Sequence, residues 1–173
     1  MEFTLQVNGA QISVTAEAEE PLLDVLRRNG YTGPKRGCRS GSCGFCTVSI
    51  DGEVEKACLR PMETVAGSEV ETISALGTQS DLHPVQEAFV DNSALQCGFC
   101  IPGMIMRTKG LLESNPDPDR EEIREELSEN LCRCTGYEKI IDAVEDAAAR
   151  MPAEVADGGL PEPTTETEPI SNE

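Results

Sequence analysis

Eight cysteines fall into two groups that differ in spacing. In the first group, Cys38, Cys43 and Cys46 are spaced C-x4-C-x2-C, and Cys58 follows on a later segment. This is the plant-type spacing of [2Fe–2S] ligands, and two ferric ions bridged by sulfides take soft thiolate ligands. A zinc site more often shows two separated C-x2-C-like pairs. The pattern therefore favours an iron–sulfur cluster over zinc.

Glycines and basic residues surround the first group. Three glycines are interleaved with its cysteines, namely Gly37, Gly41 and Gly44. Glycine allows positive φ, so we expect the loop to bring backbone N–H groups close to the sulfurs. A basic patch also lies here, made of Lys35, Arg36 and Arg39. It either offsets the negative charge of a thiolate-bound cluster or is ordinary solvated surface.

The second group has shorter spacings. Cys97 and Cys100 form C-x2-C just before Pro102, and Cys132 and Cys134 form C-x-C further along the chain. Four sulfurs meeting from two helix ends could bind zinc or a [2Fe–2S] cluster, and spacing alone leaves both open. A C-x-C pair is less common in tetrahedral zinc sites, and zinc would leave the first cluster without a redox partner. We therefore favour a second cluster.

The charge balance excludes some classes of partner. The chain of 173 residues has 14 Lys and Arg against 32 Asp and Glu, a net charge of −18. Such a surface repels nucleic acid and anionic lipid. The acidic, Lys-poor composition suits either a salt-rich host or an acidic docking face. Because we find neither an apolar run of membrane-spanning length nor a signal peptide, we expect a cytoplasmic protein whose cysteines are not disulfide-bonded.

Residues 1–76 are predicted to form an α+β domain of the β-grasp, plant-type ferredoxin type. Two hairpins are expected around Asn8-Gly9 and Asp51-Gly52, the second with strands at 47–50 and 54–58. A helix is expected between Pro21 and Gly30, and a last strand at 70–73.

The remainder is predicted to be all-helical. After a linker at 77–83, apolar residues follow helical spacing through residues 84–151, which indicates a helix bundle. Asp117-Pro118 is expected to begin one helix as N-cap and first position. Residues 152–173, rich in Pro, Glu and Thr, are predicted to be a disordered acidic tail.

No catalytic residue is predicted. His83 is the single histidine, and its position before Pro84 favours a capping or packing role. With one histidine, no arrangement of nucleophile, base and orienting group can be assembled. The chain is not expected to perform bond chemistry alone.

Five segments resemble the small iron–sulfur subunit of the xanthine dehydrogenase family of molybdenum hydroxylases, which includes the small subunit of carbon monoxide dehydrogenase. They read TGPKRGC at 32–38, CGFCTV at 43–48, LHPVQEAF at 82–89, QCGFCIPGM at 96–104 and NLCRCTGY at 130–137. The resemblance covers about residues 3–150. Ile101 and the segment at 72–76 depart from the family pattern, but neither contains a cysteine.

The resemblance implies a two-cluster electron relay within an oxidoreductase complex. Electrons would leave a molybdopterin cofactor on a large subunit, pass the helical-domain cluster and the plant-type cluster, and reach FAD on a medium subunit. Gln96 would hydrogen-bond the pterin, and its alternative role is that of an ordinary surface glutamine. The complex would be a dimer of heterotrimers oxidising carbon monoxide, an aldehyde or a heterocycle such as a purine. A free-standing two-cluster ferredoxin-like carrier is the alternative, and a zinc-stabilised interaction module is a third class.

Overall fold

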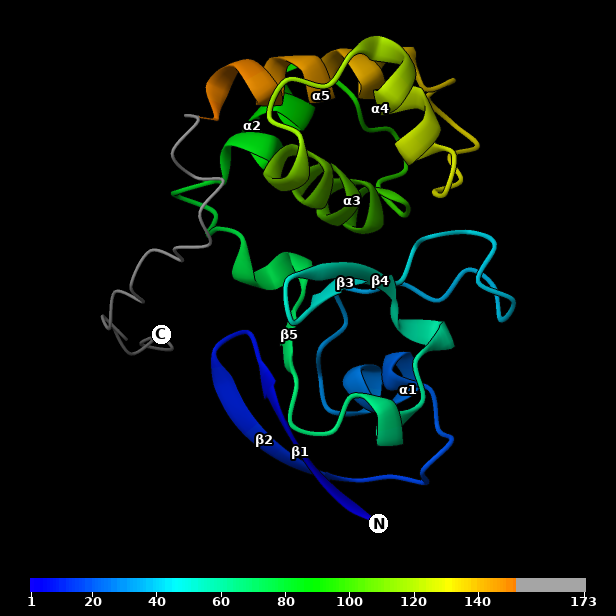
Figure 1. The fold of residues 1–173 in the computed structure, drawn as a ribbon. Helices are drawn as coiled ribbons and strands as arrows, with labels where there is room; N and C mark the ends of the chain where they lie inside the picture. Colours follow the sequence, from blue (N-terminus) through cyan, green and yellow to red (C-terminus); the bar gives the residue numbers. More distant parts are fainter. Residues whose placement is uncertain (152–173) are drawn as a thin grey trace, which may run out of the picture.

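The computed structural model describes residues 1–151, and the predicted acidic tail at 152–173 lies outside the described residues. Two hydrophobic cores form, one in the N-terminal half and one in the C-terminal half. The structure thus confirms an α+β half followed by an all-helical half (Figure 1). Within residues 1–151, no helix is both long and apolar enough to span a membrane.

The N-terminal half is built on a five-stranded sheet in the order β2-β1-β5-β3-β4. Its strands are β1 (Glu2–Val7), β2 (Ala10–Thr15), β3 (Thr47–Ile50), β4 (Glu53–Lys56) and β5 (Glu69–Glu71). β1 runs parallel to β5, and the other pairs are antiparallel. Both predicted hairpins are confirmed. Their turn residues Asn8, Gly9, Asp51 and Gly52 all have positive φ, as the tight primed turns of hairpins require.

Within the N-terminal half, α1 (Leu22–Arg28) packs against this sheet. It follows Pro21 and ends before Gly30, which has φ 91°. Its four apolar side chains pack against Leu5, Val48 and Val70 of the sheet, and all are buried: Leu22, Leu23, Val25 and Leu26. Burial of side chains of this size stabilises the fold by about 1.5–3 kcal/mol each.

Two predicted strands were too long. β4 ends at Lys56, and Ala57–Leu59 form a 3₁₀ turn, η1. The Ala57 N–H still donates to the carbonyl of Cys46 at 3.2 Å, in register with the β3–β4 pairing, and the 3₁₀ turn then takes the chain out of the sheet. β5 ends at Glu71, and the 3₁₀ turn η3 (Ile73–Ala75) directs Ile73 against the helical core. A second 3₁₀ turn, η2, spans Met62–Thr64.

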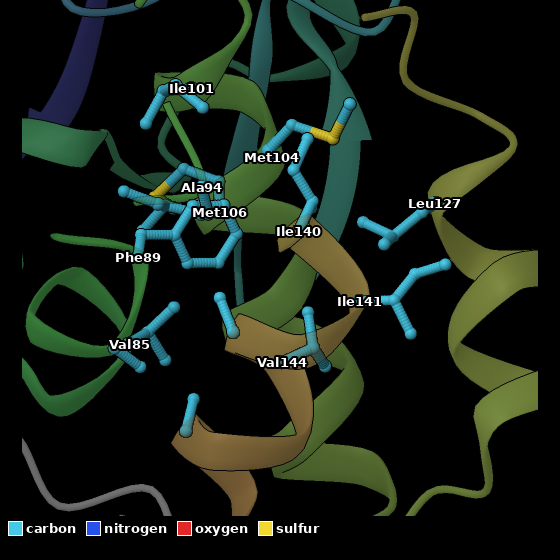
Figure 2. Close-up of a cluster of buried hydrophobic side chains, with 14 of the residues drawn as sticks. Val85, Phe89, Ala94, Ile101, Met104, Met106, Leu127, Ile140, Ile141 and Val144 are labelled. Carbon is cyan, nitrogen blue, oxygen red and sulfur yellow. The ribbon is translucent and has the colours of Figure 1, made fainter. Parts of the chain in front are cut away.

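Up to residue 151, the C-terminal half contains four helices, α2 (Pro84–Asp91), α3 (Ile101–Ser114), α4 (Arg120–Leu127) and α5 (Glu138–Arg150). Their inward faces share one core, shown in Figure 2, in which Phe89, Met104 and Val144 are fully buried. Leu76 also packs into this core although it precedes the predicted linker. The predicted boundaries 1–76, 77–83 and 84–151 stay predictions.

The predicted start of α4 was wrong by two residues. Asp119, rather than Asp117, is the N-cap, and its carboxylate accepts from the N–H groups of Glu121 and Glu122 at 2.8 and 2.9 Å. The Glu122 side chain accepts in return from the Asp119 N–H. This reciprocal capping box satisfies more N-terminal donors than a cap at Asp117 could. The predicted cap at His83 is confirmed, since its Nδ1 accepts from the Val85 N–H at 3.2 Å.

α3 lies against β3 and β4 and joins the two halves (Figure 1). Two glycines on one face of α3 make this approach feasible. A Cβ on Gly110 would overlap the Val54 side chain, and one on Gly103 would overlap the carbonyl of Gly44. Lys109 reaches from α3 to Glu71 on β5 at 3.0 Å, adding an ion pair across the boundary.

Candidate metal centres

The first cysteine group gathers around the loop between α1 and β3. Cys38, Cys43 and Cys46 lie on this loop, and η1 brings Cys58 to it. The thiols meet in pairs, Cys38 with Cys43 and Cys46 with Cys58. The predicted location of Cys58 at a strand end needs correction to a 3₁₀ turn, but the turn still ties the loop to the sheet.

The electrostatics of this group differ from one thiol to the next. Partial burial raises the pKa of Cys38, but hydrogen bonds from the Cys43 thiol and from the N–H groups of Ser40 and Cys43 outweigh it and bring the pKa to about 6. Burial raises the pKa of Cys46 to about 12, against the hydrogen bond from the Cys58 N–H. The loop therefore provides donors that stabilise thiolate, while the apolar surroundings penalise uncompensated charge.

The three glycines of the loop serve two different purposes. Gly41 and Gly44 have φ of 76° and 69°, as predicted. Gly37 is needed for space instead, because a Cβ there would overlap the ring of Phe45 and lie 3.3 Å from the Cys43 sulfur.

The second group lies at the N-terminus of α3 and on the connection between α4 and α5. The sulfurs of Cys97 and Cys134 are 3.6 Å apart and exposed, whereas Cys100 and Cys132 are buried and their thiols hydrogen-bond. One edge of the group thus faces solvent and the other faces the core. Among residues 1–151, no three or more His, Cys, Asp or Glu side chains are arranged to hold a single metal ion, and the sulfurs meet pairwise.

Local hydrogen bonds hold Cys132 in place. Thr135 contacts the Cys132 sulfur through its hydroxyl at 3.1 Å and its N–H at 3.5 Å. Burial raises the pKa of Cys132, but these bonds outweigh it and lower the pKa overall. Burial raises the pKa of Cys100 to about 12. The Tyr137 hydroxyl accepts from the Cys132 N–H at 2.7 Å and donates to the Asn130 carbonyl at 2.9 Å.

The two groups are neighbours in space. The Leu131 N–H, one residue before Cys132, donates to the carbonyl of Cys43 at 2.9 Å. The rings of Phe45 and Phe99, one from each cysteine motif, pack edge to face with centroids 5.4 Å apart. Sequence reasoning missed this adjacency, and no local pattern could have revealed it.

The structure also shows the surroundings of Gln96 and of the basic patch near the first cysteine group. Gln96 is exposed immediately before Cys97. In the basic patch, Lys35 donates to the Thr32 carbonyl at 2.8 Å and Arg36 pairs with Asp24, while Arg39 is exposed. Two of the three basic side chains are thus engaged locally.

Comparisons with known proteins bear on both halves. A model of the 2Fe-2S iron-sulfur cluster binding domain matches residues 5–72, and one of the [2Fe-2S] binding domain matches residues 72–145. A nicotinate dehydrogenase subunit of Pseudomonas putida is 48% identical over 147 residues, covering 84% of this chain and 94% of that protein. This chain belongs to the small iron–sulfur subunits of the xanthine dehydrogenase family. Subunits of this family are not catalytic alone.

In other relatives the matching region is either a separate small subunit or one part of a longer protein. The nicotine 6-hydroxylase small subunit of Paenarthrobacter nicotinovorans is 44% identical, covering 87% of this chain and 92% of that one. Aldehyde oxidoreductase of Megalodesulfovibrio gigas is 48% identical over 84% of this chain, but the match spans only 16% of that protein. The solved quinoline 2-oxidoreductase of Pseudomonas putida 86 superposes with a TM-score of 0.82 at 43% identity, covering 87% of this chain and 94% of the matched one. The domain matches also favour clusters over zinc at the second cysteine group.

Proposed function

We propose that this iron–sulfur subunit relays electrons from a molybdopterin cofactor on a large subunit to FAD on a medium subunit. Each cysteine group would hold one [2Fe–2S] cluster, which accepts and releases single electrons when bound. The proposed ligands are, in the first group, Cys38, Cys43, Cys46 and Cys58, and, in the second, Cys97, Cys100, Cys132 and Cys134. Each group brings its thiols together as two pairs, and thiolates are the ligands that such clusters require.

The observation that carries this proposal is the contact between the two groups. A single hydrogen bond separates the backbone of Cys43 from that of Leu131, which is covalently linked to Cys132. Two redox groups this close can exchange an electron through the protein. A subunit that only bound metal for stability would have no need of such proximity.

The surfaces of the two groups suggest where electrons enter and leave. Three apolar side chains are exposed in the segments of the second group, with 41%, 45% and 47% of their surface accessible: Leu95, Phe99 and Leu131. We propose that this edge docks on the large subunit, where Gln96 would hydrogen-bond the pterin. Leu59 is 55% exposed beside Gly41 at the first group, and we propose that this edge faces the FAD subunit.

The proposed assembly is a dimer of heterotrimers acting in the cytoplasm, a compartment that suits eight free cysteines. The named relatives act on different substrates, including aldehydes, nicotinate and nicotine. Substrate choice would belong to the large subunit, so we propose oxidation of an aldehyde, a heterocycle or carbon monoxide as the class.

The deciding experiment measures iron, labile sulfide, molybdenum and flavin in the chain purified with its natural partners. About four irons and four sulfides per chain, with about one molybdenum and one flavin, are expected. The same iron and sulfide without molybdenum or flavin would instead support a free two-cluster carrier. Zinc in place of iron would overturn both.

A further inference from the structure

Asn130 is a fully buried polar residue that the electron relay described above does not use. Its side chain has 0% exposure and lies two residues before Cys132. A buried amide is costly unless its hydrogen bonds are satisfied. Its partners therefore show what the residue holds together.

Both ends of the Asn130 amide are engaged. Its Nδ2 donates to the carbonyl of Gly44 at 2.9 Å, a contact between residues 86 positions apart. Its Oδ1 accepts from Arg107 Nε at 3.4 Å, and Arg107 is itself paired with Glu126 at 3.0 Å. Because arginine can only donate, it fixes Oδ1 toward itself and directs the NH₂ group toward Gly44.

The partner of this amide is the loop of the first cysteine group. Gly44 lies between Cys43 and Cys46, and a Cβ on it would overlap both the Glu129 carbonyl and the Asn130 side chain. A Cβ on Gly103, close after Cys100, would in turn overlap the Gly44 carbonyl. Gly44 therefore sits in a slot formed by segments that carry the second group.

We propose that Asn130 is a positioning residue that fixes the first cysteine loop to the second and so sets the separation of the two clusters. The inference rests on the proposed function. The Asn130 bond and the neighbouring bond from Leu131 N–H to the Cys43 carbonyl act together. Loss of the first allows the loop to move away from Cys132 and weakens the second. Electron exchange depends steeply on separation, so the relay slows without loss of either cluster.

The test uses Asn130→Asp in the full complex. Aspartate has the same shape and can still pair with Arg107, but it cannot donate to the Gly44 carbonyl. The matched control is Thr108→Val on α3, since Thr108 is also 0% exposed and its hydroxyl has no hydrogen-bond partner among residues 1–151. Both variants change a buried polar group, but only the first affects the loop.

Two measurements test the proposal. Both are made on preparations with equal iron and sulfide content. Hydrogen exchange of the Leu131 amide should accelerate about tenfold in Asn130→Asp, as expected for loss of one buried hydrogen bond. The magnetic dipolar coupling between the two reduced clusters, which falls with the cube of their separation, should decrease. Thr108→Val should match the wild type in both. Wild-type exchange and coupling in Asn130→Asp would overturn the proposal.

A second variant covers the case in which Asn130→Asp does not retain its clusters. Arg107→Met leaves the amide in place but removes the group that orients it, so a smaller change in the same direction is expected. Unchanged exchange and coupling there would also overturn the proposal. Failure of the proposed function is distinguishable, because the wild-type preparation would then lack molybdenum and flavin, or contain zinc in place of about four irons per chain, whatever the Asn130 variants show.

Discussion

The thiol edge formed by Cys97 and Cys134 is the most exposed part of the second cysteine group. We predict that Cys97→Ser abolishes the second cluster and stops electron flow from substrate to FAD, because serine is a harder and less acidic ligand than cysteine. Iron should fall from about four to about two per chain, while the spectroscopic signal of the first cluster persists.

Cys58→Ser is the matched control for this prediction. It alters a proposed ligand of the first cluster, so the signal of the first cluster should disappear and that of the second should persist. Normal reduction of FAD by substrate in Cys97→Ser would contradict the proposed route.

His83 makes a pH-dependent contribution to the free energy of unfolding. Burial, followed by the charge of Lys109, lowers its pKa below the ordinary value of 6.5. The unfolded chain therefore binds a proton at a higher pH than the folded chain does. The stabilisation is fully present above about pH 6.5 and is lost as the pH falls toward the folded pKa.

We predict that His83→Asn removes this pH dependence and retains a cap on α2, since asparagine is a good N-cap. Denaturant unfolding at several pH values between about 5 and 8 measures it. Parallel curves for the wild type and His83→Asn across this range would rule out the effect.

Among the elements, α3 depends on glycine at its contact with the sheet. Alanine for glycine in a helix normally stabilises by about 1 kcal/mol. At Gly110 the added Cβ would overlap the branched side chain of Val54, which has little freedom to move. We therefore predict that Gly110→Ala destabilises the chain by about 1–3 kcal/mol in denaturant unfolding.

The double variant Gly110→Ala with Val54→Ala tests the cause, since removing the branched side chain removes the overlap. It should be more stable than Gly110→Ala alone. If the two changes simply added, the contact between α3 and β4 would not be the reason.

For the whole molecule, the net charge of −18 predicts sensitivity to salt. Ion pairs tie the helices together, notably Arg120 with Glu138, Asp142 and Glu145. Salt weakens such exposed pairs only slightly, because each contributes about 1 kcal/mol or less. Repulsion among the excess carboxylates is spread over the whole surface and is screened more strongly.

We predict that the free energy of unfolding rises as salt increases from about 0.01 M to about 1 M, over which the Debye length falls from about 30 to about 3 Å. An uncharged co-solute at matched osmolality is the control. Equal stability throughout would show that the acidic surface is not an adaptation to salt, and would favour an acidic docking face.

The sequence by itself determined the features that depend on neighbouring residues. The hairpin turns at Asn8-Gly9 and Asp51-Gly52, the cap at His83 and the change from strands to helices all follow from local backbone preferences. Element ends were less certain. At α4, two aspartates two residues apart could both cap, and only the reciprocal bond with Glu122 selects Asp119.

The tertiary structure decided how the two cysteine groups lie relative to one another. Spacing indicated which cysteines share a group, but not that Leu131 would bond to Cys43 or Asn130 to Gly44. These contacts join residues more than 80 positions apart and depend on the approach of α3 to the sheet. That approach is set by packing at Gly103 and Gly110, where the absence of a side chain matters only once the partner surface is in place.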